Sequence, residues 1–143
     1  MIEIIKASSR QQMIDIFEIR RLVFVLEQAV DPSEEYDEHE DSSIHFLAKY
    51  QGIPCGTCRY RTTPDGIKME RFAVLKEFRG KDVGSALVNA ALDSIGETNQ
   101  KVYLHAQTHA EPFYEKHGFK QEGDLFYEAG IPHHKMKLFK HQD

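Results

Sequence analysis

The chain has 143 residues, with 23 acidic and 18 basic side chains and a formal net charge of -5 at pH 7. A chain of this length buries about two thirds of the surface that its unfolded form exposes, so it can fold as one domain without a disulfide or a structural metal. The acidic excess argues against general nucleic-acid binding, which needs clustered Lys and Arg, and a hydrophobic content of 41% argues against intrinsic disorder.

The N-terminal part of the chain is predicted to contain a strand and an amphipathic helix. Residues 2–7 have the composition of a short strand, and residues 10–28 carry apolar side chains at helical spacing. The longest uninterrupted apolar run, residues 22–26, has only five residues, whereas a membrane span needs about 20. Residues 1–6 also lack the pattern of a signal peptide. We therefore predict no membrane association and a cytoplasmic location.

An acidic segment follows at residues 31–41. It contains seven carboxylates and no Lys or Arg; subtracting them from the 23 acids leaves 16 acidic against 18 basic residues, so the rest of the chain is slightly cationic. Runs of like charge are most often solvated loops. The alternative is an anionic rim beside a binding site, which would attract an amine or another cation.

Three antiparallel strands are predicted after the acidic segment, at residues 44–50, 53–63 and 67–75. Short turns join them at Gln51-Gly52 and at Pro64-Asp65-Gly66. The segment therefore predicts a meander of three neighbouring strands.

The two cysteines of the chain, Cys55 and Cys58, lie on the second of these strands. Their spacing occurs in redox centres and in half of a zinc site. On a strand, residues three apart point to opposite faces, so the two sulfurs should diverge. No second pair at zinc-finger spacing accompanies them. We therefore predict neither a redox centre nor a metal site.

A short basic segment precedes the next predicted helix, which starts near Val83 and ends at Gly96. Arg79 and Lys81 lie in this segment. The N-terminus of a helix offers unpaired N–H groups and partial positive charge, and nearby glycines allow a ligand to approach the backbone. The segment therefore predicts a pyrophosphate site, although its spacing is neither that of the Walker P-loop nor that of the Gly-x-Gly-x-x-Gly fingerprint.

The C-terminal third is predicted to add a strand at residues 101–106, a short helix at residues 109–117 and two final strands at residues 119–128 and 133–140. The order of elements is then β-α-βββ-α-β-α-ββ. With no internal repeat or linker, this order predicts a single α+β domain over residues 1–143.

Two motifs in this order carry a family resemblance. Residues 79–84, Arg-Gly-Lys-Asp-Val-Gly, resemble the Arg/Gln-x-x-Gly-x-Gly/Ala signature of the GNAT superfamily of acyl-CoA-dependent N-acyltransferases. Phe113-Tyr114 before Gly118-Phe119 resembles the second hallmark of that family. Residues 23–28 and 129–133 also resemble a small bacterial, YjcF-like branch of it. The resemblance covers essentially the whole chain and implies a mixed, mostly antiparallel central sheet flanked by helices.

The resemblance implies acetyl-CoA as the acyl donor, without a metal. The pantetheine arm would lie along residues 72–74, the pyrophosphate would bind N–H groups of residues 79–85, and Gln107 could hydrogen-bond the pantetheine. Asp82 departs from the signature because it replaces the first Gly and places a carboxylate near a diphosphate. The implied cofactor-binding residues are Phe72, Ala73, Val74, Arg79, Gly80, Lys81, Asp82, Val83, Gly84, Ser85, Gln107, Phe113 and Tyr114.

Acetyl transfer to an amine needs a proton acceptor for the ammonium and a proton donor for the departing thiolate. Glu70 matches the position of a catalytic Glu in some relatives, and burial beside a strand would raise its pKa; the alternative is a salt bridge to Lys68. Tyr114 is the family's usual donor to the sulfur, and the alternative is an aromatic ring that fills the core. Backbone N–H groups near Ala73 would polarise the carbonyl.

The resulting prediction is an N-acetyltransferase that acts by direct attack of a small-molecule primary amine on the thioester. The alternative is a catalytically weak or inactive acyl-CoA-binding sensor. An edge strand near the C-terminus would allow two subunits to pair as a homodimer. The candidate acceptor residues are Glu27, Gln28, His45 and His133, and the histidines expected to be structural or exposed are His105, His109, His117, His134 and His141.

Overall fold

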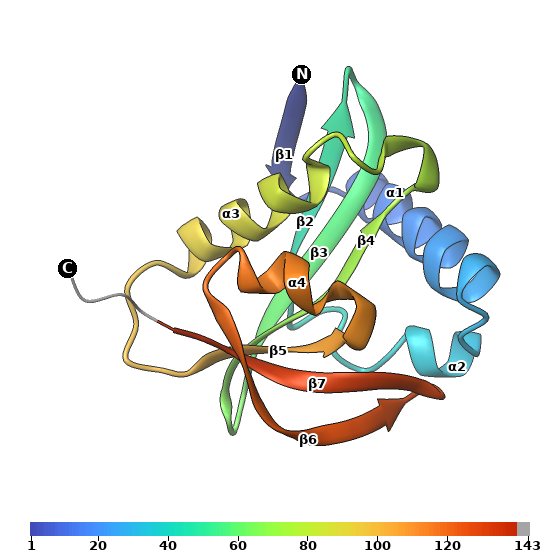
Figure 1. Ribbon diagram of the computed structural model, residues 1–143. Helices are drawn as coiled ribbons and strands as arrows, with labels where there is room; N and C mark the ends of the chain where they lie inside the picture. Colours follow the sequence, from blue (N-terminus) through green and yellow to red (C-terminus); the bar gives the residue numbers. More distant parts are fainter. Residues whose placement is uncertain (140–143) are drawn as a thin grey trace.

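The computed structural model describes residues 1–139 (Figure 1). Within them the strands form one seven-stranded sheet in the order β1-β2-β3-β4-β5-β7-β6. Neighbouring strands are antiparallel except for β4 and β5, which are parallel. The strands are β1 (Ile2–Lys6), β2 (Ile44–Tyr50), β3 (Ile53–Thr63), β4 (Gly66–Val74), β5 (Val102–Gln107), β6 (Phe119–Glu128) and β7 (Ile131–Leu138).

The helices connect these strands in the predicted order, with shorter and less regular pieces than the sequence suggests. The expected helix at residues 10–28 starts with a capping box between Ser9 and Gln12 and changes from an α-helix to a π-helix at Arg21. The helices are α1 (Arg10–Arg20), the π-helix η1 (Arg21–Glu27), α2 (Pro32–Glu35), the 3-10 helix η2 (Lys76–Phe78), α3 (Val83–Ile95), the 3-10 helix η3 (Thr108–Ala110) and α4 (Glu111–Glu115).

The two faces of the sheet bury different helices. Side chains on a strand alternate between its faces, and on one face Phe46 and Met69 pack with Leu87 of α3 and with residues of α4. On the other face Leu47 packs with Ile16 of α1. Figure 1 shows α3 and α4 on the near side of the sheet and α1 beyond it. The sheet therefore separates two spaces, each with its own lining.

A bulge and a divergence interrupt the middle of the sheet. Residues 71 and 72 of β4 both lie opposite Cys58 of β3, which is the two-against-one count of a bulge, and Arg71 has a φ of 58°. The parallel pairing of β4 with β5 ends at Met69 and Leu104. Beyond these residues β4 and β5 run apart (Figure 1). The edge of β4 that faces β5 is therefore unpaired over its last residues.

The two cysteines do not point to opposite faces, so this prediction is wrong. Cys55 lies at a bulge, because Ala48 pairs with Gly56 whereas Lys49 pairs with Pro54. The extra residue shifts the alternation, and both cysteines pack in the cluster on the α3 side. Burial raises the pKa of both thiols, which makes them poor nucleophiles. Across the described part of the chain, no three His, Cys, Asp or Glu residues are grouped as metal ligands.

The predicted fold class is confirmed in its element order and in its mixed, mostly antiparallel sheet. The last strand begins at Ile131, two residues before its expected start, since the turn at Ala129 and Gly130 is tight and both residues have positive φ. Lys140 and His141 lie outside the described residues. No helix within residues 1–139 is long and apolar enough to span a membrane.

Candidate active site

A cleft of about 400 Å³ lies where β4 ends and α3 begins. Most of the cofactor-binding residues implied by the sequence line it; Lys81, Gln107 and Tyr114 do not. Lys81 instead lies over the ring of Tyr50, with its Nζ 5.4 Å from the ring centroid. The lining consists of Phe72, Ala73, Val74, Phe78, Arg79, Gly80, Asp82, Val83, Gly84, Ser85, Ala110, Phe113 and Lys116.

The first turn of α3 brings backbone N–H groups to this cleft, which an anion could bind. The N–H groups of Val83, Gly84 and Ser85 belong to the first turn, where a helix has no acceptors of its own and carries partial positive charge. A Cβ on Gly84 would lie 3.2 Å from the Phe113 ring. Glycine at this position therefore permits the close approach of α3 to α4, and this approach makes the cleft narrow.

Asp82 adopts the left-handed conformation immediately before α3, with a φ of 69° and a ψ of 13°. Glycine reaches this region without strain, and Asp and Asn tolerate it better than other residues do. The first Gly of the signature therefore has a backbone role, which Asp82 can fill. Its exposed side chain makes no capping hydrogen bond, so the carboxylate adds negative charge at the anion site without a local compensating contact.

Replacing Asp82 by Gly or by Asn should tighten acetyl-CoA binding about fivefold. Like charges about 6 Å apart in a partly exposed site repel by roughly 1 kcal/mol, which is about fivefold in affinity. Both replacements remove the charge and tolerate the positive φ, so they should give similar gains, and the gains should shrink at high salt. Titration calorimetry measures the affinities. Unchanged affinity in both variants would show that the carboxylate does not act on the diphosphate.

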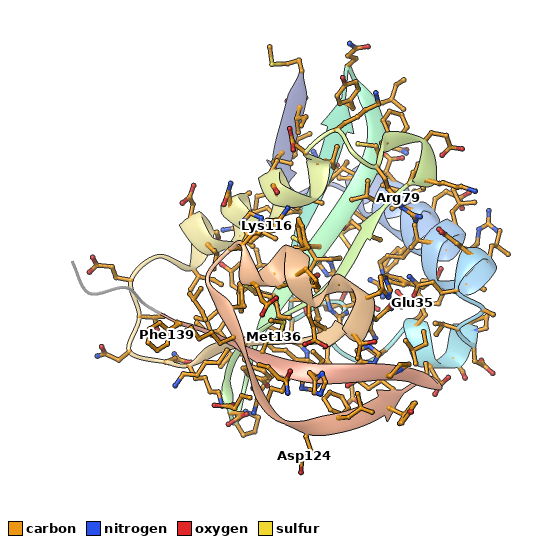
Figure 2. All side chains as sticks on the ribbon, in the orientation of Figure 1. Glu35, Arg79, Lys116, Asp124, Met136 and Phe139 are labelled. Carbon is orange, nitrogen blue, oxygen red and sulfur yellow. The ribbon has the colours of Figure 1, made fainter. Side chains whose placement is uncertain are left out.

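The guanidinium of Arg79, at the cleft, is held by two residues, Glu27 and Val74. Its Nη1 and Nη2 atoms donate to Glu27 at 2.7 and 2.6 Å, and its Nε donates to the Val74 carbonyl at 2.9 Å. Figure 2 places Arg79 between the segment before α3 and the N-terminal helices. The Leu75 N–H donates to the Cys55 carbonyl on β3. Because the backbone groups of successive strand residues point to opposite edges of the strand, the N–H and carbonyl of Val74 point to the open edge of β4. Glu27, expected to contact the acceptor, instead holds Arg79 at this edge.

A larger cavity of about 680 Å³ opens on the α1 side of the divergent strands. Phe72 and Ala110 line both this cavity and the cleft, so the two spaces meet at the β4 bulge. Most of the polar side chains of its walls come from β3, β4, β5, β6, β7 and the acidic segment. A ligand bound in the cleft can therefore present its end to a second ligand in the cavity.

Tyr114 of α4 lies beside the junction of the two spaces. Its ring packs edge-on against Phe72, with centroids 5.6 Å apart, and against Phe119 at 6.2 Å. The residue lines the larger cavity and is nearly buried. Burial raises the pKa of Tyr114 above its usual range. The phenol therefore stays protonated near neutral pH and can donate a hydrogen bond.

Glu70 is surrounded by three cationic side chains. Its carboxylate binds Arg59, accepts a hydrogen bond from Arg61 Nε at 2.8 Å and lies 3.2 Å from Lys68 Nζ. Burial alone would raise the pKa of Glu70, but Arg59, Lys68 and Arg61 together lower it to about 2. The expected raised pKa is therefore wrong, and the alternative salt bridge to Lys68 is present. A carboxylate with so low a pKa is a poor acceptor for an amine proton.

The acidic segment is bound to the protein by arginines. Arg20 and Arg59 are almost fully buried, at 1% and 0% exposure. Arg59 contacts Asp37 at 2.7 Å, and Arg20 contacts Glu40 at 2.8 Å. The arginines that hold the segment are Arg20, Arg59 and Arg71, and their carboxylate partners within it are Glu35 (labelled in Figure 2), Asp37 and Glu40. These three carboxylates are neutralised, so the segment is only in part the anionic rim that its composition suggested.

Of the remaining candidate acceptor residues, Gln28 and His133 line the cavity and His45 does not. His45 does not line either space: it is buried on β2, and its Nε2 hydrogen-bonds the Glu40 carbonyl at 2.8 Å. Burial lowers the pKa of His45. Gln28 lines the cavity and accepts a hydrogen bond from Gln107 Nε2 at 2.9 Å. The cavity therefore holds Gln28 and Gln107 together, although the sequence assigned them to different ligands.

His133 and His105 lie together on the far wall of the cavity. The Nδ1 of His133 hydrogen-bonds the Ile131 carbonyl at 2.7 Å, and its ring stacks on Phe126. The Nδ1 of His105 lies 2.7 Å from Glu128 Oε1. Burial acts to raise the pKa of Glu128, but the hydrogen bond with His105 helps to lower it below its ordinary value. The ionised carboxylate can only accept, so His105 Nδ1 donates and its Nε2 is free to accept a proton.

Sequence reasoning missed His105 as a cavity residue. Gln107 was expected in the site, and side chains two residues apart on a strand share a face. This alternation alone places His105 beside it on the predicted strand at residues 101–106. Glu128 could not be found in this way, because it comes from a strand 23 residues further along the chain.

Comparison with known proteins agrees with this geometry. A family model described as an acetyltransferase (GNAT) domain matches residues 6–140. YjcF of Bacillus subtilis (strain 168), described as an uncharacterized N-acetyltransferase, is 38% identical over 132 residues, which cover 91% of this chain and 94% of YjcF. The crystal structure of Escherichia coli ElaA superposes with a TM-score of 0.84 at 27% identity, covering 96% of this chain and 99% of ElaA. A GNAT family acetyltransferase from Elizabethkingia anophelis, solved with acetyl-CoA bound, has a TM-score of 0.68 at 20% identity and covers 95% of this chain and 94% of that one.

Proposed function

The chain belongs to the GNAT acetyltransferase family, and we propose that it transfers the acetyl group of acetyl-CoA to the primary amine of a small molecule. The observation that carries the proposal is the junction of the cleft and the acceptor cavity at Phe72 and Ala110, where β4 and β5 diverge. In the reaction the amine nitrogen forms a bond to the carbonyl carbon as the C–S bond breaks. The amine loses one proton, and the thiolate gains one.

The cleft has the chemistry that acetyl-CoA needs. The first turn of α3 offers N–H groups to the diphosphate, and the open edge of β4 offers backbone groups near Ala73 and Val74 to the pantetheine arm. Bound there, acetyl-CoA supplies an activated thioester. The Val74 carbonyl accepts from Arg79, so the arm would have to displace this contact or pair beside it. The neighbour of the same fold from Elizabethkingia was solved with acetyl-CoA bound, which supports acetyl-CoA as the ligand.

His105 is the proposed proton acceptor. An alkyl amine with a pKa near 10.4 is neutral in only about one molecule in 10³ to 10⁴ at pH 7, so the reaction needs a base. His105 lines the cavity, and Glu128 orients it with Nε2 free. Imidazole is also the side chain that ordinarily exchanges protons near neutral pH. Glu70, with a pKa of about 2, would instead keep its neighbouring cations in place.

Replacing Tyr114 by Phe should lower kcat by about 10- to 100-fold and leave acetyl-CoA affinity nearly unchanged. The phenol would donate a hydrogen bond to the departing sulfur, and a hydrogen bond to a charged group contributes about 1.5 to 3 kcal/mol. The ring contacts with Phe72 and Phe119 remain in the variant. Steady-state kinetics and cofactor titration measure the two effects. An unchanged kcat would remove Tyr114 from the mechanism.

Release of free thiol from acetyl-CoA in the presence of a panel of amines tests the proposed function. Amine-dependent thiol release together with the N-acetylated product supports it. The second candidate is an acyl-CoA-binding sensor, and the observation in its favour is the carboxylate of Asp82 at the anion site. Measurable acetyl-CoA binding without thiol release from any amine would support the sensor instead. A cytoplasmic location and the pairing of two subunits stay predictions of the sequence.

A further inference from the structure

Two partly neutralised cations line the acceptor cavity. Arg61 of β3 and Lys68 of β4 lie opposite each other in register, and both line the cavity. Both bind the carboxylate of Glu70, Arg61 through its Nε and Lys68 through its Nζ. Arg59 binds the same carboxylate. One carboxylate is therefore shared among three cations.

The ion-pair network that contains Arg61, Lys68 and Glu70 has more cations than carboxylates. Within residues 1–139 the cations of the network are Arg20, Arg59, Arg61, Lys68 and Arg71, and its carboxylates are Glu35, Asp37, Glu40 and Glu70. Five cations face four anions. Arg61 uses only its Nε, so the N–H groups on its two Nη atoms can bind a ligand. Lys68 has one ion-pair partner and two further N–H groups to donate.

The opposite wall of the cavity carries the reverse charge. Lys68 pairs in register with Tyr103 of β5, and His105 lies two residues further along the same face. From strand spacings, the backbones at Lys68 and His105 are at least about 8 Å apart, since β5 leaves β4 beyond Leu104. Glu128, bound to His105, supplies the carboxylate on this wall. The cavity therefore offers an anion site and a cation site a short distance apart.

We propose that the acceptor is an aminocarboxylic acid, whose carboxylate binds Arg61 and Lys68 while its amine lies against His105 and Glu128; this inference rests on the proposed acetyl transfer. The planar guanidinium matches a carboxylate with parallel hydrogen bonds. The N–H groups that Arg61 and Lys68 have left beside Glu70 match the two oxygens of one carboxylate. A polyamine would place a second cation against Arg61 and Lys68, where like charges repel. The product is the N-acetyl aminocarboxylate, with free CoA thiol.

Matched acceptors test the proposal on the unaltered protein. Glycine, phenylalanine, lysine and 4-aminobutyrate are each compared with the corresponding carboxamide and with the amine that lacks the carboxyl group, by the rate of thiol release. At least one aminocarboxylate should have a kcat/KM at least tenfold above both of its matched compounds. Equal rates within every set, or preferential turnover of phosphoethanolamine or of a polyamine, would overturn the proposal.

Variants then assign the preference to the two side chains. Arg61→Gln and Lys68→Met should each raise the KM for the preferred aminocarboxylate about tenfold or more, and change the KM for its carboxamide less than twofold. Lys135→Gln is the matched control, because Lys135 lies on the same sheet but outside the cavity, paired with Asp65. Equal KM changes for the acid and the amide would contradict carboxylate recognition. The thermal unfolding temperature shows whether each variant is folded, and if one is not, the other carries the test.

Failure of this proposal is distinguishable from failure of the proposed function. Turnover of amines without any preference for a carboxylate contradicts only the aminocarboxylate assignment. Absence of turnover with every amine contradicts the acetyl transfer. In that case, calorimetric binding of the same acids and amides tests the site directly: tighter binding of the acids that is lost in Arg61→Gln supports the site, and equal binding overturns it.

Discussion

Replacing Arg59 by Met is expected to lower the free energy of unfolding by about 3 kcal/mol or more. Arg59 is 0% exposed and contacts Asp37, Glu40 and Glu70. Removing one partner of a buried ion pair leaves uncompensated buried charge, which typically costs about 3 to 5 kcal/mol. Arg20, Arg61, Lys68 and Arg71 still contact the same carboxylates, so the lower end of that range is expected. Urea-induced unfolding followed by circular dichroism measures the loss.

Arg21→Met is the control for this prediction. Arg21 also pairs with a carboxylate, that of Glu18, but both side chains are about half exposed, and exposed pairs contribute little to stability. Its replacement should cause no measurable loss. Equal losses in the two variants would contradict the role of burial.

The same network gives stability a defined dependence on pH. The pKa of Glu70 falls from its ordinary value near 4.3 to about 2 in the folded protein. Its contribution is therefore fully present above about pH 5 and is lost as the pH falls through 4 towards 2. In Arg59→Met the pKa of Glu70 should rise, so this loss should begin at a higher pH.

Replacing His105 by Gln is expected to reduce kcat about 10²-fold or more, since a positioned general base contributes about 10² to 10⁴ in rate. Glutamine fills similar space but cannot take up the amine proton. Acetyl-CoA affinity should not change, because His105 does not line the cofactor cleft. The variant can acetylate only amine that is already neutral, so its kcat/KM should follow the neutral fraction of the amine, and its pH profile should differ from that of the unaltered protein. Steady-state kinetics over a range of pH measure both effects.

His134→Gln provides a matched control for His105. The Nδ1 of His134 also lies 2.7 Å from a carboxylate oxygen, that of Glu111, but His134 lines neither space. Its replacement should leave the rate and the pH profile unchanged. Glu128→Gln should lower kcat by less than His105→Gln does, because it removes the orienting partner and keeps the imidazole. A pH profile in His105→Gln that matches the original protein would assign the base elsewhere.

The lining of the proposed cofactor cleft was largely predictable because most of its residues are close together in sequence. The residues from Arg79 to Ser85 adopt one turn and the start of one helix, and a short-range pattern of glycines and charges describes them. The left-handed φ of Asp82 follows the same logic, since a position where relatives carry Gly is often one that needs positive φ. A local feature that failed was the orientation of Cys55 and Cys58, because the alternation of side chains along the sequence does not reveal the bulge in β3.

The acceptor side was predictable only in its rough location. Gln28 and His133 do line the cavity, whereas Glu27 pairs with Arg79 and His45 is buried away from it. Each of these outcomes depends on a partner far along the chain. Glu27 and Arg79, for example, are 52 residues apart. No pattern within a single predicted element identifies such a partner.

The sequence by itself determined the family and the order of the elements, and it predicted the proposed anion site before α3, because backbone conformation and helix termini depend on neighbouring residues. Only the tertiary structure decided which charged side chains are buried and which opposite charges they meet. Seven carboxylates in one segment suggested an anionic rim, yet three of them meet buried arginines, and Glu70 lies among cations that lower its pKa. The energy of a charge depends on burial and on the nearest opposite charge in space, and neither can be read from its position in the chain.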